Sequence, residues 1–347
     1  MSNQVDKAMV DEFNAGFIHL SQQMECRFSG KVREETQNSE SQFWDQISPT
    51  VAQKKTGRHS DTPLIHTPHD RRRCTLEDYE WADLVDKADK IRMISDPAGD
   101  YLKAAVAAMN RAKDDVVIRE FHATAYTGRS GGTAVDLPLG NVRGCVDGST
   151  SGGVPSATNL AYLNEYSLRL AAEFFDEKEA ANDGDSKYIA INARQLYKGL
   201  LADNNITSSD YNVIKSLVRG EVDSFMGFEF IRTERLNTVA ALQSVSGAGD
   251  RYTTSSNDLI FDQDTGKSIA FDSTGTSSHN ITTKAGSHIV LPCWVKSGLL
   301  KATGDDIQTR ITERDDKSYS VQPFCSMSIG ATRMEEDKCL ELVAFNG

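Results

Sequence analysis

A long amphipathic helix is the strongest structural constraint in this sequence. Ser95 and Asp96 precede Pro97, which is a helix-start signal, because a short polar side chain accepts a hydrogen bond from an unpaired backbone N–H and proline has no N–H to satisfy. Apolar residues then recur every three or four positions up to Phe121, before the glycine-rich segment TGRSGG. About 24 helical residues span roughly 36 Å, long enough to cross a whole domain.

One face of this predicted helix is expected to be buried. The apolar stripe consists of Leu102, Val106, Met109, Val117 and Phe121. We expect it to pack on a sheet of C-terminal strands that includes Ile311, Val321, Ile329 and Leu342. Lys113 is expected on the opposite, solvent-facing side of the helix.

The segments after this helix alternate between helical and extended patterns without a βαβ repeat. Apolar spacing predicts a second helix over residues 157–180, another helix after the strand SKYIAI and a small helix over 293–301. Further strands are predicted around FMGFEFIRT, from Ile307 to Met334 and at CLELVAF. Residues 237–290 are rich in Ser, Thr and Gly, which predicts short antiparallel hairpins. The fold class is therefore α+β.

Before the helix, residues 28–75 are expected to form a long two-stranded excursion that buries little in its own chain. Val32, Thr36, Phe43 and Ile47 suit extended structure. The loop that follows carries the turn-forming residues Pro49, Gly57, Pro63 and Pro68 and the cations Lys54, Lys55 and Arg58. Residues 1–25 are expected to form a polar, partly helical arm.

A dense run of charges lies between the excursion and the helix. Arg71, Arg72 and Arg73 are followed by Glu77, Asp78, Glu80, Trp81, Asp83 and Asp86. Opposite charges in such a run can form a self-complementary ladder between two copies of a chain. The alternative is a solvated face. If the ladder forms, charge reversal at Arg72 should weaken association without changing the melting temperature of the single chain.

Composition disfavours several functions. The chain has 39% hydrophobic and 25% charged residues, which is typical of a globular protein. Its net charge of -12 disfavours a protein whose function is to bind phosphate groups. No apolar run reaches the roughly 20 residues needed to cross a bilayer, and the beginning of the sequence does not resemble a signal peptide. We therefore expect the protein to be made in a cytoplasm and to stay there.

No metal or cofactor site is predicted. The cysteines, at positions Cys26, Cys74, Cys145, Cys293, Cys325 and Cys339, lack CxxC spacing and are expected to be free thiols. A zinc site from His59, His66, His69 and Cys74 is less favoured than a solvated loop. Asp262, Asp264 and Gly266 resemble the start of a calcium loop, but the later ligands are missing and a hairpin turn is favoured.

Catalytic constellations are also missing from the sequence. Gly247 and Gly249 lie in SGAGDR, which lacks the lysine of a phosphate-binding loop, and no GxSxG motif occurs. The carboxylate pairs Glu34–Glu35, Asp114–Asp115, Asp305–Asp306 and Asp315–Asp316 are adjacent in the sequence. Because neighbours in a strand point to opposite faces, solvated edges are favoured over an acid and base pair.

The order of these elements resembles the major capsid protein of tailed bacteriophages, the fold named for the phage Hong Kong 97. Three stretches carry the resemblance: DYEWADLVDKADKIRMISDPAGDYLKAAVAAMNRAKDDVVI, YIAINARQLYKGLLADNNITSSDYNVIKSLVRGEVDSFMGFEFIRTERL and CWVKSGLLKATGDDIQTRITERDDKSYSVQPFCSMSIGATRMEED. They are similar, in turn, to the start of the family's spine helix, to the core of its axial domain and to its closing segment.

The resemblance implies a division of the chain into the parts of that fold. They are an N-terminal arm (1–27), an extended β-hairpin loop (28–75), a peripheral domain (76–156) with a spine helix at 97–121, an axial domain (157–290) with a β insertion near 237–290, and a return to the peripheral domain (291–347).

It also implies a function and partners. The chain is expected to assemble with itself, as hexamers and pentamers, into the icosahedral head shell of a tailed phage. Its acidic wall would confine double-stranded DNA without specific binding. Scaffolding, portal and decoration proteins are further expected partners. No enzyme activity, cofactor or membrane is implied, and the expected location is the virion after assembly in the host cytoplasm.

Subunit contacts are expected at the excursion and the charged run, because the family's extended loop lies over a neighbouring subunit. The residues are Lys54, Lys55, Arg58, Arg71, Arg72, Arg73, Glu77, Asp78, Glu80 and Trp81. Two other functions stay open. A hydrolase or other enzyme would need a convergent nucleophile and base, and a tail or fibre component is favoured by the Ser/Thr-rich hairpins but opposed by the long helix.

Overall fold

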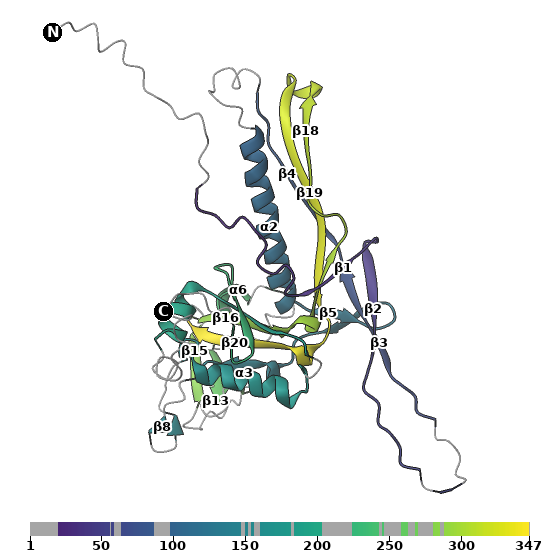
Figure 1. Cartoon of the computed structure of the whole chain (residues 1–347), viewed down its shortest axis with the longest axis vertical. Helices are drawn as coiled ribbons and strands as arrows, with labels where there is room; N and C mark the ends of the chain where they lie inside the picture. Colours follow the sequence, from purple (N-terminus) through teal and green to yellow (C-terminus); the bar gives the residue numbers. More distant parts are fainter. Residues whose placement is uncertain are drawn as a thin grey trace, which may run out of the picture. The chain divides into compact units, whose positions relative to one another are not determined.

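The computed structural model divides the chain into two compact units that mix helix and strand, which confirms the α+β class (Figure 1). The smaller unit contains residues 1–26, 78–113 and 305–328, and the larger unit contains 27–77, 114–304 and 329–347. The structure describes residues 20–55, 57–58, 64–86, 98–146, 150–151, 154–155, 160–181, 184–202, 224–242, 245, 258–262, 268–269, 280–284 and 288–346. Most of the predicted N-terminal arm lies outside these residues.

The long helix predicted at 97–121 is present as α2, Ala98–His122 (Figure 1). Asp100 in its first turn and Arg119 in its last turn have the charges that stabilise a helix dipole. Residues 98–113 belong to the smaller unit and 114–122 to the larger unit. In the larger unit the buried residues of α2 include Val116, Val117, Ile118 and Phe121.

The buried face of α2 in the smaller unit differs from the predicted stripe. Ala105, Ala107 and Met109 are buried, whereas Leu102 and Val106 are only half-buried. Met109 is buried as predicted, but Ala107 lies two positions from Ala105 and Met109 and so on nearly the opposite side of the helix. This part of α2 is therefore covered on more than one side, which a single apolar stripe does not predict. Of the predicted packing partners, Ile311 is 51% exposed, so its assignment to the core is wrong.

The prediction that Lys113 faces solvent is also wrong. Its side chain is only 13% exposed, and its Nζ lies 2.5 Å from Oδ1 of Asp306. A lysine can be largely buried when its amine meets a carboxylate. The partner comes from a distant part of the sequence, so helical periodicity alone does not reveal it.

Strands in the smaller unit surround β19, Ser320–Arg333, which pairs with β4, Glu77–Ala82, and with β18, Gln308–Arg314. β18 and β19 are antiparallel, with Gln308 opposite Ser326 and Arg314 opposite Ser320. The connection contains the 3-10 turn Asp315–Lys317 and two residues with positive φ, Ser318 and Tyr319. The single strand predicted from Ile307 to Met334 is therefore a hairpin.

The core of the larger unit is a six-stranded sheet in the order β11-β12-β10-β16-β20-β7. The strands are β7 (Val142–Gly144), β10 (Lys187–Ile191), β11 (Ser224–Phe225), β12 (Phe228–Arg232), β16 (His288–Val295) and β20 (Cys339–Phe345). Every residue of β16 is buried, as expected for a strand covered on both faces. Its Trp294 ring stacks on Phe28 at 5.5 Å and on Tyr188 at 6.0 Å.

Helix α3, Glu165–Glu177, begins later than the helix predicted at 157–180. Asn164 caps it, because the Asn164 side chain accepts a hydrogen bond from the backbone N–H of Ser167 at 2.8 Å. Residues 160–164 are not helical, and 157–159 lie outside the described residues. The helix predicted after β10 is present as a π-helix, Gln195–Leu200.

The small helix predicted at 293–301 is wrong. These residues form the end of β16, a 3-10 turn at Lys296–Gly298 and the start of β17, Leu299–Thr303. Short apolar runs fit both a helix and a buried strand, and here the strand partners decide: β17 pairs with β1, Arg33–Thr36, in parallel and with the end of β19 antiparallel. Residues 33–36, predicted within the excursion, therefore belong to this sheet, and Phe28 and Val32 just before them are buried. The prediction that residues 28–75 bury little in their own chain is wrong for this first part.

A buried arginine joins β19 to the end of α2 within the larger unit. Arg333 is fully buried. Its Nη1 donates to the backbone carbonyls of Phe121, at 2.7 Å, and Ala123, and its Nη2 donates to the carbonyl of Val135 at 3.1 Å. The last carbonyls of a helix have no partner within the helix, so Arg333 acts as the C-terminal cap of α2.

The remaining elements are short. They are β5 (Ala125–Thr127), β6 (Thr133–Val135), β8 (Thr150–Ser151), β9 (Val154–Pro155), α6 (Val239–Leu242) and the 3-10 turns Leu139–Asn141 and Glu336–Lys338. In the Ser/Thr-rich region, β13 (Asp258–Asp262) pairs antiparallel with β14 (Ser268–Ile269) and β15 (Asn280–Lys284). This confirms the antiparallel pairing predicted there.

Candidate functional site

The predicted excursion contains an antiparallel hairpin of β2, Ser41–Ile47, and β3, His69–Thr75. Ser41 lies opposite Thr75, and Ile47 lies opposite His69. β3 also pairs with β5, and β5 with β6, so the hairpin belongs to a four-stranded sheet in the order β2-β3-β5-β6. In Figure 1 the two strands continue into a long loop that runs away from this sheet.

This hairpin loop is exposed throughout its described part, residues 48–55, 57–58 and 64–68. Val51 is 81% exposed and Leu64 is 86% exposed. Lys54, Lys55 and Arg58 are exposed as well, and the one acidic residue in the sequence of the loop is Asp61. Burying a Val or Leu side chain is worth about 1.5–3 kcal/mol. Within its own chain the loop does not bury these side chains and so does not obtain this stabilisation. Its apolar and cationic side chains face outward.

The consecutive arginines of β3 point alternately to opposite faces of the sheet. Arg71 lies on the outer face, where its Nε is 2.8 Å from Oδ1 of Asp45, its neighbour on β2. Arg72 points inward and is 5% exposed. It donates from Nε to the Met334 carbonyl at 3.0 Å and pairs with Glu336. Its interpretation as a rim charge is wrong, because strand alternation places Arg72 inside its own chain.

The acidic residues that follow β3 have separate partners. Glu77 accepts a hydrogen bond from Nη2 of Arg119 at 2.7 Å in the larger unit. In the smaller unit, the Ser328 hydroxyl donates to Asp78 at 2.5 Å. Glu80 is exposed and Trp81 is half-buried. Contacts of these residues with a second copy of the chain stay a prediction.

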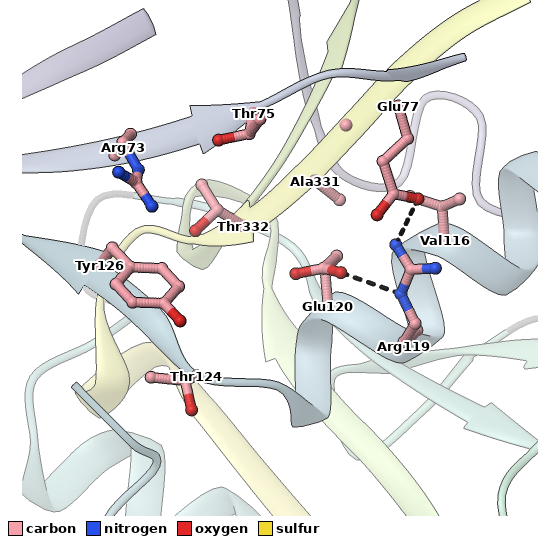
Figure 2. A pocket seen from close by; sticks show the side chains of 11 residues that line it. Arg73, Thr75, Glu77, Val116, Arg119, Glu120, Thr124, Tyr126, Ala331 and Thr332 are labelled. Atoms are coloured by element: carbon pink, nitrogen blue, oxygen red, sulfur yellow. Dashed lines mark hydrogen bonds and ion pairs between the residues drawn. The ribbon is translucent and has the colours of Figure 1, made fainter. Parts of the chain in front are cut away.

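A pocket of about 130 Å³ lies at the root of the hairpin, and Figure 2 shows it from close by. It is lined by Arg73, Thr75, Glu77, Val116, Arg119, Glu120, Thr124, Tyr126, Gly330, Ala331 and Thr332. The Arg73 guanidinium lies over the Tyr126 ring, 4.8 Å from its centre. The sequence does not reveal Arg119, Glu120 and Tyr126 as site residues, because no helix or strand pattern marks polar side chains that meet only after folding.

Arg119 binds both carboxylates on one side of this pocket (Figure 2). It donates from Nη2 to Glu77 at 2.7 Å and from Nε to Glu120 at 2.9 Å. Burial lowers the pKa of Arg119, but the two carboxylates outweigh burial and raise it. Burial also raises the pKa of Glu120. The positive charge of Arg119 lowers this pKa only in part, and the negative charge of Glu77 raises it further. Glu120 therefore accepts a proton at a higher pH than an exposed glutamate.

Within the described ranges, no group of three or more His, Cys, Asp or Glu residues is arranged to hold a metal ion. His66 and His69 are exposed, whereas Cys74 is buried, and burial raises the pKa of its thiol to about 12. Asp262 ends β13. His59, Gly247, Gly249, Asp264 and Gly266 lie outside the described residues. All six cysteines are free thiols, as predicted. No described helix is long and apolar enough to cross a membrane.

The adjacent carboxylates bind partners of their own within each unit. Asp114 accepts hydrogen bonds from the backbone N–H groups of Arg27 and Phe28, whereas Asp115 pairs with Arg235. Glu34 pairs with Lys301 and Glu35 with Arg33. Asp306 binds Lys113, and Asp316 binds Arg314. Each of these contacts is an ion pair or a backbone hydrogen bond of the kind that holds a fold together.

The chain is similar to phage capsid proteins in sequence family and in fold. The family model described as phage capsid protein matches residues 5–343, and no curated protein matches. Among solved structures, the capsid of cyanophage P-SCSP1u has a TM-score of 0.65 at 13% identity, covering 100% of this chain and 97% of that chain. The acidic stable capsid of Helicobacter pylori bacteriophage KHP30 has a TM-score of 0.64 at 10% identity, covering 99% and 98%. The capsid of Ralstonia phage GP4 has a TM-score of 0.63 at 6% identity, covering 97% and 95%.

Proposed function

This chain belongs to the phage capsid protein family, and from that membership we propose that the hairpin loop binds a neighbouring copy and so holds the head shell together. The protein is a structural major capsid protein of the virion, and its copies assemble into a shell. The finer proposal is an icosahedral shell of hexamers and pentamers around double-stranded DNA, built in the host cytoplasm.

The exposed hairpin loop is the observation that carries this proposal. Ile47, Val51, Leu64 and Ile65, which lie in or beside this loop, are all exposed, and several large apolar side chains exposed on one segment are typical of a binding surface. The loop carries three cations, Lys54, Lys55 and Arg58, and one acid, Asp61, so it is net positive on a chain with a net charge of -12. The surface that best complements this loop is therefore the acidic surface of another copy.

The proposed contact residues are the subunit-contact residues predicted from the sequence, with Arg72 left out. They are Lys54, Lys55, Arg58, Arg71, Arg73, Glu77, Asp78, Glu80 and Trp81. Most of them are exposed, and exposed charges act on the rate and salt dependence of association more than on folding. Each contact contributes only about 1 kcal/mol or less, but every subunit of a closed lattice repeats it.

Other partners follow from the family and the charge. We propose that scaffolding, portal and decoration proteins bind the shell, and that the acidic chain confines DNA without gripping its phosphates. An enzymatic role gains no support from the family, and neither does a role in the tail or a fibre.

Deletion of residues 50–68 tests the role of the hairpin loop. We expect a folded subunit with an unchanged melting temperature that forms no stable shells, measured by negative-stain microscopy and thermal unfolding. A second variant replaces the same residues by a Gly/Ser segment of equal length, which separates the side chains from the length of the loop. We expect it to fail in assembly as well. Normal shells from the deletion would refute the proposal.

A further inference from the structure

Arg73 differs from the two arginines beside it in having no carboxylate partner in the described chain. Arg71 binds Asp45 and Arg72 binds Glu336, whereas the recorded contact of the Arg73 guanidinium is the ring of Tyr126 at 4.8 Å. Tyr126 is its neighbour across β3 and β5. Stacking on an aromatic ring leaves the N–H groups at the edge of the guanidinium available for another ligand.

The chain also holds the Arg73 side chain in place. Gly131 has a φ of +65°, and a Cβ added there would lie 2.7 Å from Cδ of Arg73 and 2.8 Å from Cε1 of Phe43. The aliphatic part of Arg73 therefore packs directly on the Gly131 backbone beside Phe43. An arginine fixed in this way loses little conformational freedom when it binds, which strengthens binding.

The surroundings of Arg73 select the kind of ligand. Figure 2 shows Arg73 and Tyr126 on the opposite side of the pocket from Arg119, with Thr332 between them. Glu77 and Glu120 both bind Arg119, and among the described residues no ion pair joins either of them to Arg73. A planar guanidinium binds a planar carboxylate through two parallel hydrogen bonds. The pocket of about 130 Å³ has room for more than one heavy atom, since a water molecule needs about 10–15 Å³.

We propose that the Arg73 pocket binds the carboxylate of an aspartate or glutamate side chain from a second copy of this chain. The inference rests on the proposed function, because it needs copies packed in a shell. Aspartate and glutamate outnumber lysine and arginine by 50 to 38, so each copy brings unmatched carboxylates to its neighbours. A nucleic acid phosphate is a poorer ligand, because nucleic acid is a polyanion that a chain with a net charge of -12 repels along its whole length.

A lysine at position 73 makes this contact visible. In shells of the Arg73→Lys variant, a water-soluble carbodiimide should join the new amine to the bound carboxylate as an amide. Mixed shells of ¹⁵N-labelled and unlabelled subunits distinguish links between copies from links within one copy by mass spectrometry. We expect peptides containing position 73 to be linked to an acidic peptide of another copy. The matched control is Arg71→Lys, whose carboxylate partner is Asp45 of the same chain, and it should give the link within one copy.

A second measurement needs no substitution. Phenylglyoxal, which modifies accessible arginines, should react with Arg73 at least tenfold more slowly in shells than in free subunits. Shells in which position 73 forms no link between copies, or in which Arg73 reacts as fast as in free subunits, overturn the carboxylate pocket and leave the proposed function standing. An unmodified chain that forms no shells under any condition would instead refute the proposed function.

Discussion

Arg333→Met is expected to destabilise the larger unit strongly, because it removes the cap of α2. The three hydrogen bonds from Arg333 to backbone carbonyls each involve a charged donor. Such bonds contribute roughly 1.5–3 kcal/mol each. Methionine keeps an unbranched side chain but is shorter and has no donor, so the variant leaves the carbonyls of Phe121, Ala123 and Val135 without this hydrogen-bond partner.

Part of this loss of stability is offset, because the variant does not bury a charged group when it folds. Burying an arginine costs several kcal/mol after relaxation of the protein, and the unfolded chain no longer gains by hydrating it. The favourable position of a cation at the end of a helix, worth up to about 2 kcal/mol when partly buried, is lost as well. We therefore expect the free energy of unfolding to fall by about 3–5 kcal/mol.

The assay is urea unfolding of unassembled subunits, followed by tryptophan fluorescence and circular dichroism. Agreement between the two signals is required before one free energy is assigned. The control is Arg314→Met, since Arg314 lies on exposed β18 and pairs with Asp316 in the adjoining turn. The control should not shift the urea midpoint measurably. A change below about 1 kcal/mol for Arg333→Met would refute the capping role.

Two further predictions concern charged groups in the larger unit. Arg72→Glu should lower the free energy of unfolding by at least about 3 kcal/mol, because it places a second carboxylate beside Glu336 at a site that is 5% exposed; an unchanged melting temperature of the free subunit would contradict this. Glu120→Gln should raise the melting temperature by an amount that grows as the pH rises above about 4.5, the usual pKa of a glutamate. Because the pKa of Glu120 is raised in the folded protein, the protonated side chain adds stability at low pH, and this stability is lost as the pH rises through that pKa. Glutamine stays uncharged at every pH and so does not lose it. A difference in melting temperature between the variant and the unmodified protein that does not vary with pH would contradict this prediction.

Local signals in the sequence predict the long helix well. The Ser95–Asp96–Pro97 signal and the apolar period give 97–121, and α2 runs over Ala98–His122. This agreement arises because capping and periodicity involve residues within a few positions of one another. The same holds for β2, where Phe43 and Ile47 favour a strand, but not for its partner β3, whose residues are mostly charged.

The candidate site depends on pairing between distant segments, and the sequence does not reveal it. Arg71, Arg72 and Arg73 look alike in sequence, but the alternation of β3 gives them an outer, an inner and an outer position. Which of the three points inward depends on the register in which β3 pairs with β2. The long loop between the two strands does not determine that register. Lys113 shows the same limit, since its partner Asp306 is distant in sequence.

The pairing order of the six-stranded sheet also governs when a newly made chain can fold. β20 lies between β16 and β7, and Glu341 pairs with Val142, which is synthesised much earlier. Contacts between such distant segments form slowly and only after both have left the ribosome. The hairpin loop, with Val51 and Leu64 exposed, emerges long before that. We expect the six-stranded sheet of a nascent chain to remain incompletely folded until β20 is translated. Truncated chains would therefore not enter the growing shell.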